Sequence, residues 1–415
     1  ILIALYYHIY GFEPALPFAA LALGGAALFA VATELLARRA PRPGSESAAA
    51  IFATGAIAAL ALTLTFALEK GWLTVALALL VPGVAWVAEQ RPLPWLRWLA
   101  AIVAGLVVAR IAYEPRIVVE AGAAPIFNWI LYGYGVPAAA FWVAGHVLRK
   151  RADDEPSRIV DAAAIVFTAL CFCLEVRHYL HGGNIYWRSA DLAELATEVV
   201  GALAFAIGLE RLRARTGSIV HNIAAMVFAA LAFVAIVLGL LLIDNPWLWS
   251  TNVGGLLVNL NLLGYAAPAA LAATLGLVTR PTRPDWYRAV AAITAVVLAV
   301  AYLSLEVARF YQGPRLSVGA ISEAEGYTYS AVWLAFGVIL LVVGIGLRSQ
   351  PVRLASAAVV LLTVGKVFLI DMAGLTGAWR ALSFIGLGLV LVGIGFLYQR
   401  LLFARRPTTE PSGAQ

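Results

Sequence analysis

Residues 218–243 read SIVHNIAAMVFAALAFVAIVLGLLLI and contain no Asp, Glu, Lys or Arg. A helix needs about 20 predominantly apolar residues to cross the hydrocarbon core of a bilayer, which is roughly 30 Å thick. Lipid cannot hydrogen-bond to an open backbone, so a single segment of this kind must satisfy its own amides and carbonyls. The stretch therefore predicts a membrane-spanning α-helix.

The rest of the chain has the same character. Hydrophobic residues make up 62% of it and charged residues 13%, whereas soluble domains average about 45–50% apolar and about 25% charged. So few charges could not form the water-facing surface of a 415-residue globule. Apolar runs of spanning length predict an all-α, polytopic helix bundle with about thirteen spanning helices. The predicted spans are 15–37, 48–68, 71–88, 94–112, 126–148, 159–180, 191–210, 218–243, 254–278, 288–312, 327–347, 352–371 and 378–403.

The basic residues predict the orientation of these spans. When the loops are assigned alternately to two sides, one side receives twenty of the 29 Lys and Arg residues and the other side receives nine. The positive-inside rule places the richer side in the cytoplasm. We therefore expect a multi-pass protein of a bacterial inner membrane with a cytoplasmic C-terminus. Membrane lipid is the expected partner, and the net charge of +6 is assigned to orientation rather than to nucleic-acid binding.

Several kinds of chemistry have no signal in the sequence. A Gly-rich phosphate loop, a His-Glu-x-x-His motif and a Gly-x-Ser-x-Gly elbow are all missing. Cys171 and Cys173 lie in one apolar run without further Cys or His at ligand spacing, so packing is their expected role. No cofactor and no metal is predicted. Because Ile1 lies inside an apolar stretch, we expect the chain to be a fragment of a longer protein.

An internal repeat recurs at one fixed separation along the chain. Glu175 and Glu194 match Glu306 and Glu325, each within similar neighbours. At the same separation, the stretch that contains Asn128, Tyr134 and Pro137 matches the one that contains Asn259, Tyr265 and Pro268. We call two residues related by this separation repeat partners. Matches that include charged and Pro positions at one separation indicate a repeat rather than chance likeness between apolar helices.

The repeat predicts the organisation of the chain. We expect a remnant of a preceding repeat at 1–37, an eroded four-helix repeat at 48–150, a second repeat at 159–279, a third at 286–403 and a disordered cytoplasmic tail at 404–415. Since four spans return the chain to its starting side, the copies share one orientation. Parallel repeats of this kind disfavour the inverted-repeat transporters.

The last segment carries the most distinctive motifs. It reads KVFLID at 366–371, LTG at 375–377, SF at 383–384, GLG at 386–388 and YQR at 398–400, and EAEGYTYS precedes it at 323–330. This pattern resembles the C-terminal signature of a family of bacterial predicted membrane proteins, domain of unknown function 2339. The specific likeness covers roughly residues 300–403, and the hydrophobic pattern extends it over the chain. The resemblance implies a long polytopic protein and no established activity.

Polar residues gather in two matching outer loops and in the last pair of helices. We predict an outer-face polar site formed by Glu175, Arg177, His178, Glu194, Glu306, Arg309, Glu325, Lys366, Asp371 and Arg380. In one interpretation the glutamates line a periplasm-facing pocket, with Arg177 and Arg309 as counter-ions or anion clamps. In the other, each glutamate pairs with an Arg of a neighbouring repeat and only fastens helix ends.

Two details of this site have their own alternatives. His178 and His181 could contribute to a metal site, but their repeat partners are Arg309 and Gln312, so interfacial histidines are favoured. Lys366 is expected either to extend to the outer surface or to face the bundle and meet Glu325 or Glu306, while Asp371 pairs with Arg380.

Three functions are compatible with these observations. The first is binding or transport of a cell-envelope or lipid-linked substrate at the outer-face site. The second is an envelope transferase that uses an outer-face carboxylate, Glu175 or Glu306, as general base. The third is a scaffold or assembly factor whose charges are structural, with other envelope proteins as partners. The sequence favours the first over the second and leaves all three open.

Overall fold

The computed structural model is helical almost throughout. It describes residues 2–10, 13–38, 44–68, 70–90, 94–113, 121–122, 124–186, 191–255, 258–317, 319, 321–372 and parts of 382–396. In these residues the only β-structure is two isolated bridges, Asn252 with Arg315 and Gly254 with Asn259. The predicted all-α fold is therefore confirmed.

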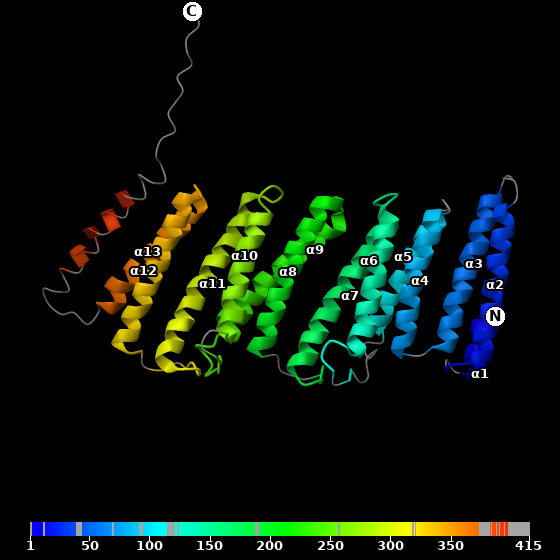
Figure 1. Ribbon diagram of the computed structural model, residues 1–415, viewed down its shortest axis with the longest axis horizontal. Coiled ribbons are helices and arrows are strands. Elements are labelled where there is room, and N and C mark those ends of the chain that lie inside the picture. Colours follow the sequence, from blue (N-terminus) through cyan, green and yellow to red (C-terminus); the bar gives the residue numbers. More distant parts are fainter. Residues whose placement is uncertain are drawn as a thin grey trace, which may run out of the picture. The chain divides into compact units, whose positions relative to one another are not determined.

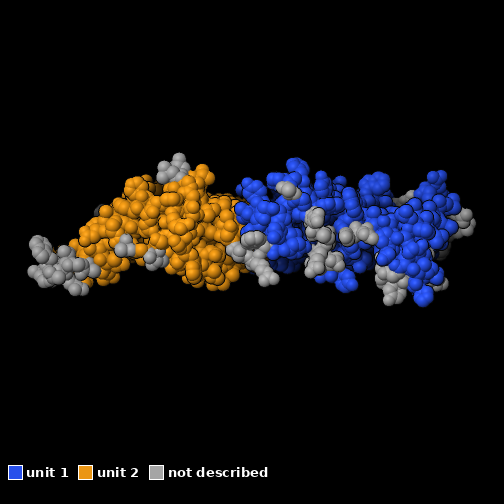
Figure 2. Space-filling view, turned by 90° about the horizontal axis from the view of Figure 1, so that it is seen from below, with its two compact units in different colours: residues 1–190, 208–227 blue, residues 191–207, 228–415 orange. Residues whose placement is uncertain are grey.

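The chain forms two compact units, coloured separately in Figure 2. Unit 1 comprises Ile1–Ala190 and Gly208–Val227, and unit 2 comprises Asp191–Ile207 and Phe228–Gln415. These limits cut across the four-helix repeats expected from the sequence, whose boundaries stay a prediction.

Unit 1 holds the first seven α-helices. These are α1 (Leu2–Tyr10), α2 (Leu16–Arg38), α3 (Ser45–Ala67), α4 (Lys70–Gln90), α5 (Pro94–Tyr113), the π-helix η1 (Leu131–Gly135) with α6 (Val136–Arg149), and α7 (Glu155–Leu180). From α4 to α7 the helices run alternately up and down, so the α5–α6 connection and the end of α7 lie at the same end of the unit (Figure 1). We call this the outer end and the opposite one the inner end.

Unit 2 repeats this alternation. Two helices have residues in both units, α8 (Leu192–Thr216) and α9 (Ile219–Val234). The remainder of unit 2 contains η2 (Ala235–Ile243), η3 (Leu262–Ala266), α10 (Ala267–Val278), α11 (Asp285–Gln312), α12 (Glu323–Gly346), α13 (Gln350–Lys366) and η4 (Val367–Asp371). The α9–α10 connection and the end of α11 share the outer end of this unit (Figure 1).

Ten helices of the described residues are long and apolar enough to cross a bilayer. The shortest of them has 20 residues, which corresponds to about 30 Å at 1.5 Å per residue. Leu262–Val278 is a shorter apolar helix. The prediction of about thirteen spans is therefore neither confirmed nor contradicted, whereas the prediction of a multi-pass membrane protein is confirmed.

Several threonine hydroxyl groups form hydrogen bonds within their own helices. Thr33, Thr54, Thr63 and Thr65 each donate a hydrogen bond to the carbonyl oxygen four residues earlier. Within hydrocarbon, water cannot satisfy such groups, so the backbone of the same helix is their available acceptor. These polar residues are thus consistent with apolar spans.

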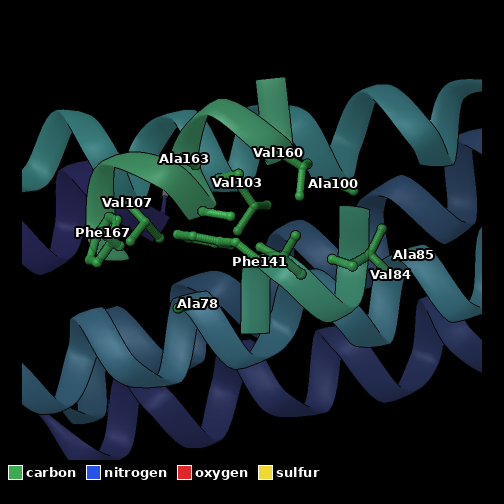
Figure 3. Packing of buried hydrophobic residues seen from close by; sticks show 14 of the residues in the cluster. Ala78, Val84, Ala85, Ala100, Val103, Val107, Phe141, Val160, Ala163 and Phe167 are labelled. Carbon is green, nitrogen blue, oxygen red and sulfur yellow. The ribbon is translucent and has the colours of Figure 1, made fainter. Parts of the chain in front are cut away.

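The core of unit 1 lies between α4, α5, α6 and α7. Phe141 and Phe167 are wholly buried, with ring centroids 5.3 Å apart in an edge-on arrangement. Figure 3 shows them among small and β-branched side chains such as Val103 and Val107. In unit 2 a second cluster surrounds Tyr265 and Leu298. Close packing of these side chains sets the relative positions of the helices that carry the polar residues.

Candidate functional site

A buried amide holds Glu175 at the outer end of unit 1. Asn128 precedes η1 and is 4% exposed. Its Nδ2 donates to Glu175 Oε2 at 2.9 Å, while its Oδ1 accepts the backbone N–H of Ile130 at 2.7 Å. The same side chain thus begins the helix and positions a carboxylate 47 residues away.

His178 fastens the turn that leads to Asn128. Its Nε2 lies 2.7 Å from the carbonyl oxygen of Gly122, and because a carbonyl oxygen can only accept, Nε2 carries the hydrogen. Gly122 has a φ of 85°, a conformation that favours glycine. Trp129 N–H donates to Ala121 O at 3.0 Å and closes the turn.

Unit 2 contains the same arrangement around Glu306. Asn259 Nδ2 and Asn261 Nδ2 donate to Glu306 Oε1 at 2.8 Å and 3.0 Å. Asn259 Oδ1 accepts the backbone N–H of Leu262 at 2.8 Å, as Asn128 does for Ile130. The bond between Asn259 and Glu306 therefore joins the repeat partners of Asn128 and Glu175.

The turn before Asn259 is fastened in the same way. Arg309, 8% exposed, donates from Nη2 to the carbonyl oxygen of Gly254 at 2.9 Å. Gly254 has a φ of 87°, close to that of Gly122. Arg309 therefore takes the place of His178, and both side chains hold the carbonyl of a glycine turn.

The helices that follow these turns also correspond. η1 and η3 have equal length, and each is followed by a helix with Pro near its first residue. We call the two arrangements the amide–carboxylate clusters: Asn128, Glu175, His178 and Gly122 in unit 1, and Asn259, Asn261, Glu306, Arg309 and Gly254 in unit 2. Their likeness supports the proposed repeat.

Neither carboxylate of these clusters has a cationic partner in the described residues. Glu175 and Glu306 form hydrogen bonds with amides and no ion pair. Arg177 donates from Nε to Ile185 O at 2.8 Å, and Arg309 bonds Gly254. The structure thus does not bring the expected counter-ions to these glutamates, because both guanidinium groups are directed at backbone carbonyls.

Glu194 and Glu325 occupy the beginnings of α8 and α12. Glu194 is 1% exposed, and its backbone N–H donates to Asp191 Oδ1 at 2.9 Å. Glu325 accepts from Gln312 Nε2 at 3.0 Å and from Tyr329 Oη at 2.7 Å. Glu325 is therefore bonded to the end of α11 and to its own helix, which fits a structural role.

Lys366 faces the bundle, but it meets a different acid from the one expected. Its Nζ donates to Asp371 Oδ1 at 2.6 Å, Ser330 Oγ at 2.8 Å and Gly326 O at 2.9 Å. The expected pairing with Glu325 or Glu306 is wrong, because η4 is a π-helix, in which residues five apart lie on one face. Arg380, the expected partner of Asp371, lies outside the described residues.

A buried polar group at the inner end of unit 1 was missed from the sequence. Asp161 is wholly buried and pairs with Arg149, and His221 Nε2 lies 3.8 Å from Asp161 Oδ2. His221 Nδ1 lies 2.8 Å from Thr216 Oγ1. One signal was available, since Asp161 is a lone acid near the start of an apolar run.

The predicted residues thus fall into separate groups. Among the described residues no three His, Cys, Asp or Glu side chains could hold one metal ion. The two amide–carboxylate clusters offer hydrogen-bond acceptors, Glu325 and Lys366 are bonded within unit 2, and Asp161 marks the inner end of unit 1.

Comparison with known proteins identifies a family and no characterised relative. No curated protein and no solved structure matches the chain. A family model described as predicted membrane protein, DUF2339, matches residues 1–401. That match confirms the resemblance of the last segment and extends it over nearly the whole chain. The chain belongs to the DUF2339 family of predicted membrane proteins.

Proposed function

We propose that the chain is a bacterial inner-membrane protein that binds, and carries across or along the membrane, a cell-envelope or lipid-linked substrate. Its C-terminus is cytoplasmic and its outer ends face the periplasm. The substrate contacts the amide–carboxylate clusters, with Glu175 and Glu306 as the recognising acceptors. The basic residues of the inner connections support this orientation.

The observation that carries this proposal is that no cation of the described residues pairs with Glu175 or Glu306. Ionisable groups within a membrane protein usually pair with one another, because an unpaired charge is costly to bury. Glu175 and Glu306 have only amide partners in the described residues. Glu175 Oε1 is buried and has no hydrogen-bond partner.

Recurrence of the arrangement in the two units also favours a shared role. Both clusters combine a glycine turn, a fastening donor, an amide and a carboxylate at an outer end. A scaffold needs helix ends to be fixed, and Glu325 shows that the chain can do so with a glutamate bonded to its neighbours. Oε1 of Glu175 has no donor among the residues that the structure describes, and such an acceptor goes beyond that need.

Replacement of the carboxylates by isosteric amides tests the proposal in cells. We expect Glu175→Gln and Glu306→Gln, alone and together, to leave the deletion phenotype of a host strain uncorrected while the membrane level of the protein stays unchanged. Glu34→Gln is the matched control, since Glu34 is an exposed residue in an ion pair with Arg38.

Two results would contradict the proposal. Full correction of the phenotype by the double glutamine variant would show that neither carboxylate is needed. A fall in protein level that parallels the loss of phenotype would assign the carboxylates to folding, as in a scaffold. If a glutamine variant still bound the substrate but no longer formed product, the result would instead favour the second function, an envelope transferase.

A further inference from the structure

Three aromatic side chains of unit 1 contact one another, and one of them, Trp129, directly follows Asn128 of the cluster in the sequence. Trp72 of α4 and Trp129 have ring centroids 5.0 Å apart at 85°. Trp129 and Tyr132 have centroids 6.1 Å apart at 76°. Trp72 is 60% and Tyr132 50% exposed. Trp129 directly follows Asn128, so two of the three rings, those of Trp129 and Tyr132, lie on the short segment that carries the amide that holds Glu175.

Unit 2 lacks this aromatic group. The repeat partners of Trp129 and Tyr132 are Leu260 and Leu263. Trp and Tyr are common at the surfaces of a bilayer, so the rings alone carry no inference. The inference comes from Trp129 and Tyr132 lying on the segment that also carries Asn128, the amide that holds Glu175, in one of two otherwise matching clusters.

The carboxylate of Glu175 indicates which chemical groups a ligand of this site would carry. Its Oε2 accepts from Asn128, while its buried Oε1 has no donor in the described residues. Of the cations at this end, two have described partners: Arg110 Nε bonds Thr74 at 3.2 Å and Arg177 Nε bonds Ile185 O. A carboxylate in such surroundings is stabilised by a ligand that brings both a positive charge and a hydrogen-bond donor.

We propose that the outer end of unit 1 binds a primary ammonium group, which donates to Glu175 Oε1 and places its charge against the faces of the aromatic group. Cations within about 6 Å of a Trp or Tyr ring are attracted to its face. The inference rests on the proposed function and narrows its substrate to one that carries an amine. The ammonium belongs either to a lipid headgroup or to a soluble amine.

A binding experiment with matched probes tests this inference. The purified chain in detergent is titrated with short-chain phosphatidylethanolamine, phosphatidylcholine and phosphatidylglycerol of equal acyl length, and with free ethanolamine. Bound probe is counted by native mass spectrometry. We expect phosphatidylethanolamine to bind most tightly, because phosphatidylcholine has no N–H to donate and phosphatidylglycerol has no cation.

Variants then assign the binding to this site. We expect Glu175→Gln to weaken phosphatidylethanolamine binding about tenfold to a hundredfold, the loss typical of a charge-assisted hydrogen bond. Trp129→Leu, which introduces the residue of unit 2, is expected to weaken it about twofold to fivefold. Glu34→Gln is expected to leave it unchanged, because Glu34 pairs with Arg38 and belongs to neither cluster. Elution and thermal unfolding of each variant confirm its fold, and Trp129→Leu tests the site if Glu175→Gln does not fold.

The outcomes separate this inference from the proposed function. Binding of free ethanolamine that depends on Glu175 supports the inference and identifies a soluble amine. Equal binding by wild type and Glu175→Gln overturns it. Binding of phosphatidylglycerol that depends on Glu175 overturns the inference that the ligand is an ammonium group. This result does not contradict the proposed function. No binding by any probe overturns the inference, and the cell-based test of Glu175 and Glu306 still decides the proposed function.

Discussion

The bond between Asn128 and Glu175 at the outer end of unit 1 recurs in unit 2 between Asn259 and Glu306. At the inner end the two units differ. Unit 1 has a buried ion pair between Asp161 and Arg149. Their repeat partners are Ala292 and Arg280, so the second copy keeps the cation and lacks the acid.

This difference indicates that the charged residues of the outer ends and those of the inner end of unit 1 have different roles. A polar arrangement that occurs in both units forms in two different packing environments, which fits a shared role in binding. A polar arrangement that occurs in one unit depends on the packing of that unit instead. We therefore expect changes at the outer end to affect function with little effect on stability, and changes at the inner end of unit 1 to do the reverse.

The largest expected effect comes from the acid that only unit 1 contains. Asp161→Ala leaves Arg149 without its buried partner, and breaking a buried pair from one side typically costs about 3–5 kcal/mol. Chemical unfolding in detergent micelles measures the loss of unfolding free energy. Arg149→Ala combined with Asp161→Ala should recover part of it, because the unpaired charge is then gone. Arg280→Ala, the matched change in unit 2, should have a small effect, and equal effects of Asp161→Ala and Arg280→Ala would remove the contrast.

A smaller effect is expected at a pair of matching glycines. A methyl group on Gly145 would overlap Asp161 Oδ1, whereas one on Gly276 would lie 3.6 Å from Ala291 Cβ, an ordinary contact. Gly145→Ala should therefore lower the unfolding free energy by about 1–3 kcal/mol, as overpacking does. Gly276→Ala should be neutral or slightly stabilising, since Ala favours a helix over Gly. Thermal unfolding of both variants makes the comparison, and a tolerated Gly145→Ala would contradict the packing around Asp161.

The smallest effect concerns the residues that begin α7 and α11. Asp154 accepts the backbone N–H of Ser157 at 3.2 Å and two bonds from Arg97 at 2.7 Å, whereas Asp285 is 97% exposed and bonds Arg288. Asp154→Ala should cost about 1–2 kcal/mol, the usual effect of losing an N-terminal cap. Asp285→Ala should produce no measurable change. Chemical unfolding of the two variants measures both effects, and equal losses would show that the cap and its bonds to Arg97 contribute nothing.

The effect of Asp154 depends on pH. Burial raises the pKa of Asp154, but the hydrogen bonds and charge of Arg97, together with Ser157, outweigh it and hold the pKa below its ordinary value of 3.8. Because the folded state binds the proton less readily than the unfolded state, the contribution of Asp154 is complete above about pH 4 and disappears as the pH falls further. The stability difference between wild type and Asp154→Ala should narrow in acid, and a difference that widened there would show the opposite linkage.

The class of protein could be predicted before any coordinates, and so could the correspondence between Glu175 and Glu306. A spanning helix must hide its backbone from lipid over a fixed thickness, so the length of each apolar run predicts its structure without reference to other segments. The fixed separation between matching residues could be read from the sequence, and two of the four glutamates that it relates, Glu175 and Glu306, belong to the two clusters.

The partners of the charged residues could not be predicted in the same way. Glu175 is held by Asn128 across 47 residues, and Asp161 of α7 lies near His221 of α9, two helices further along the chain. Lys366 and Asp371 are close in sequence, yet an α-helix would have separated them, and the π-helix brings them together.

Bilayer thickness and backbone hydrogen bonding act on each segment alone, so the sequence by itself determined the membrane class and the helical fold. Pairing of charges depends on which helix faces meet and on local winding, both of which follow from packing of side chains distant in sequence. Only the tertiary structure therefore decided that the described partners of Glu175 and Glu306 are amides, and that Asp161 pairs with Arg149.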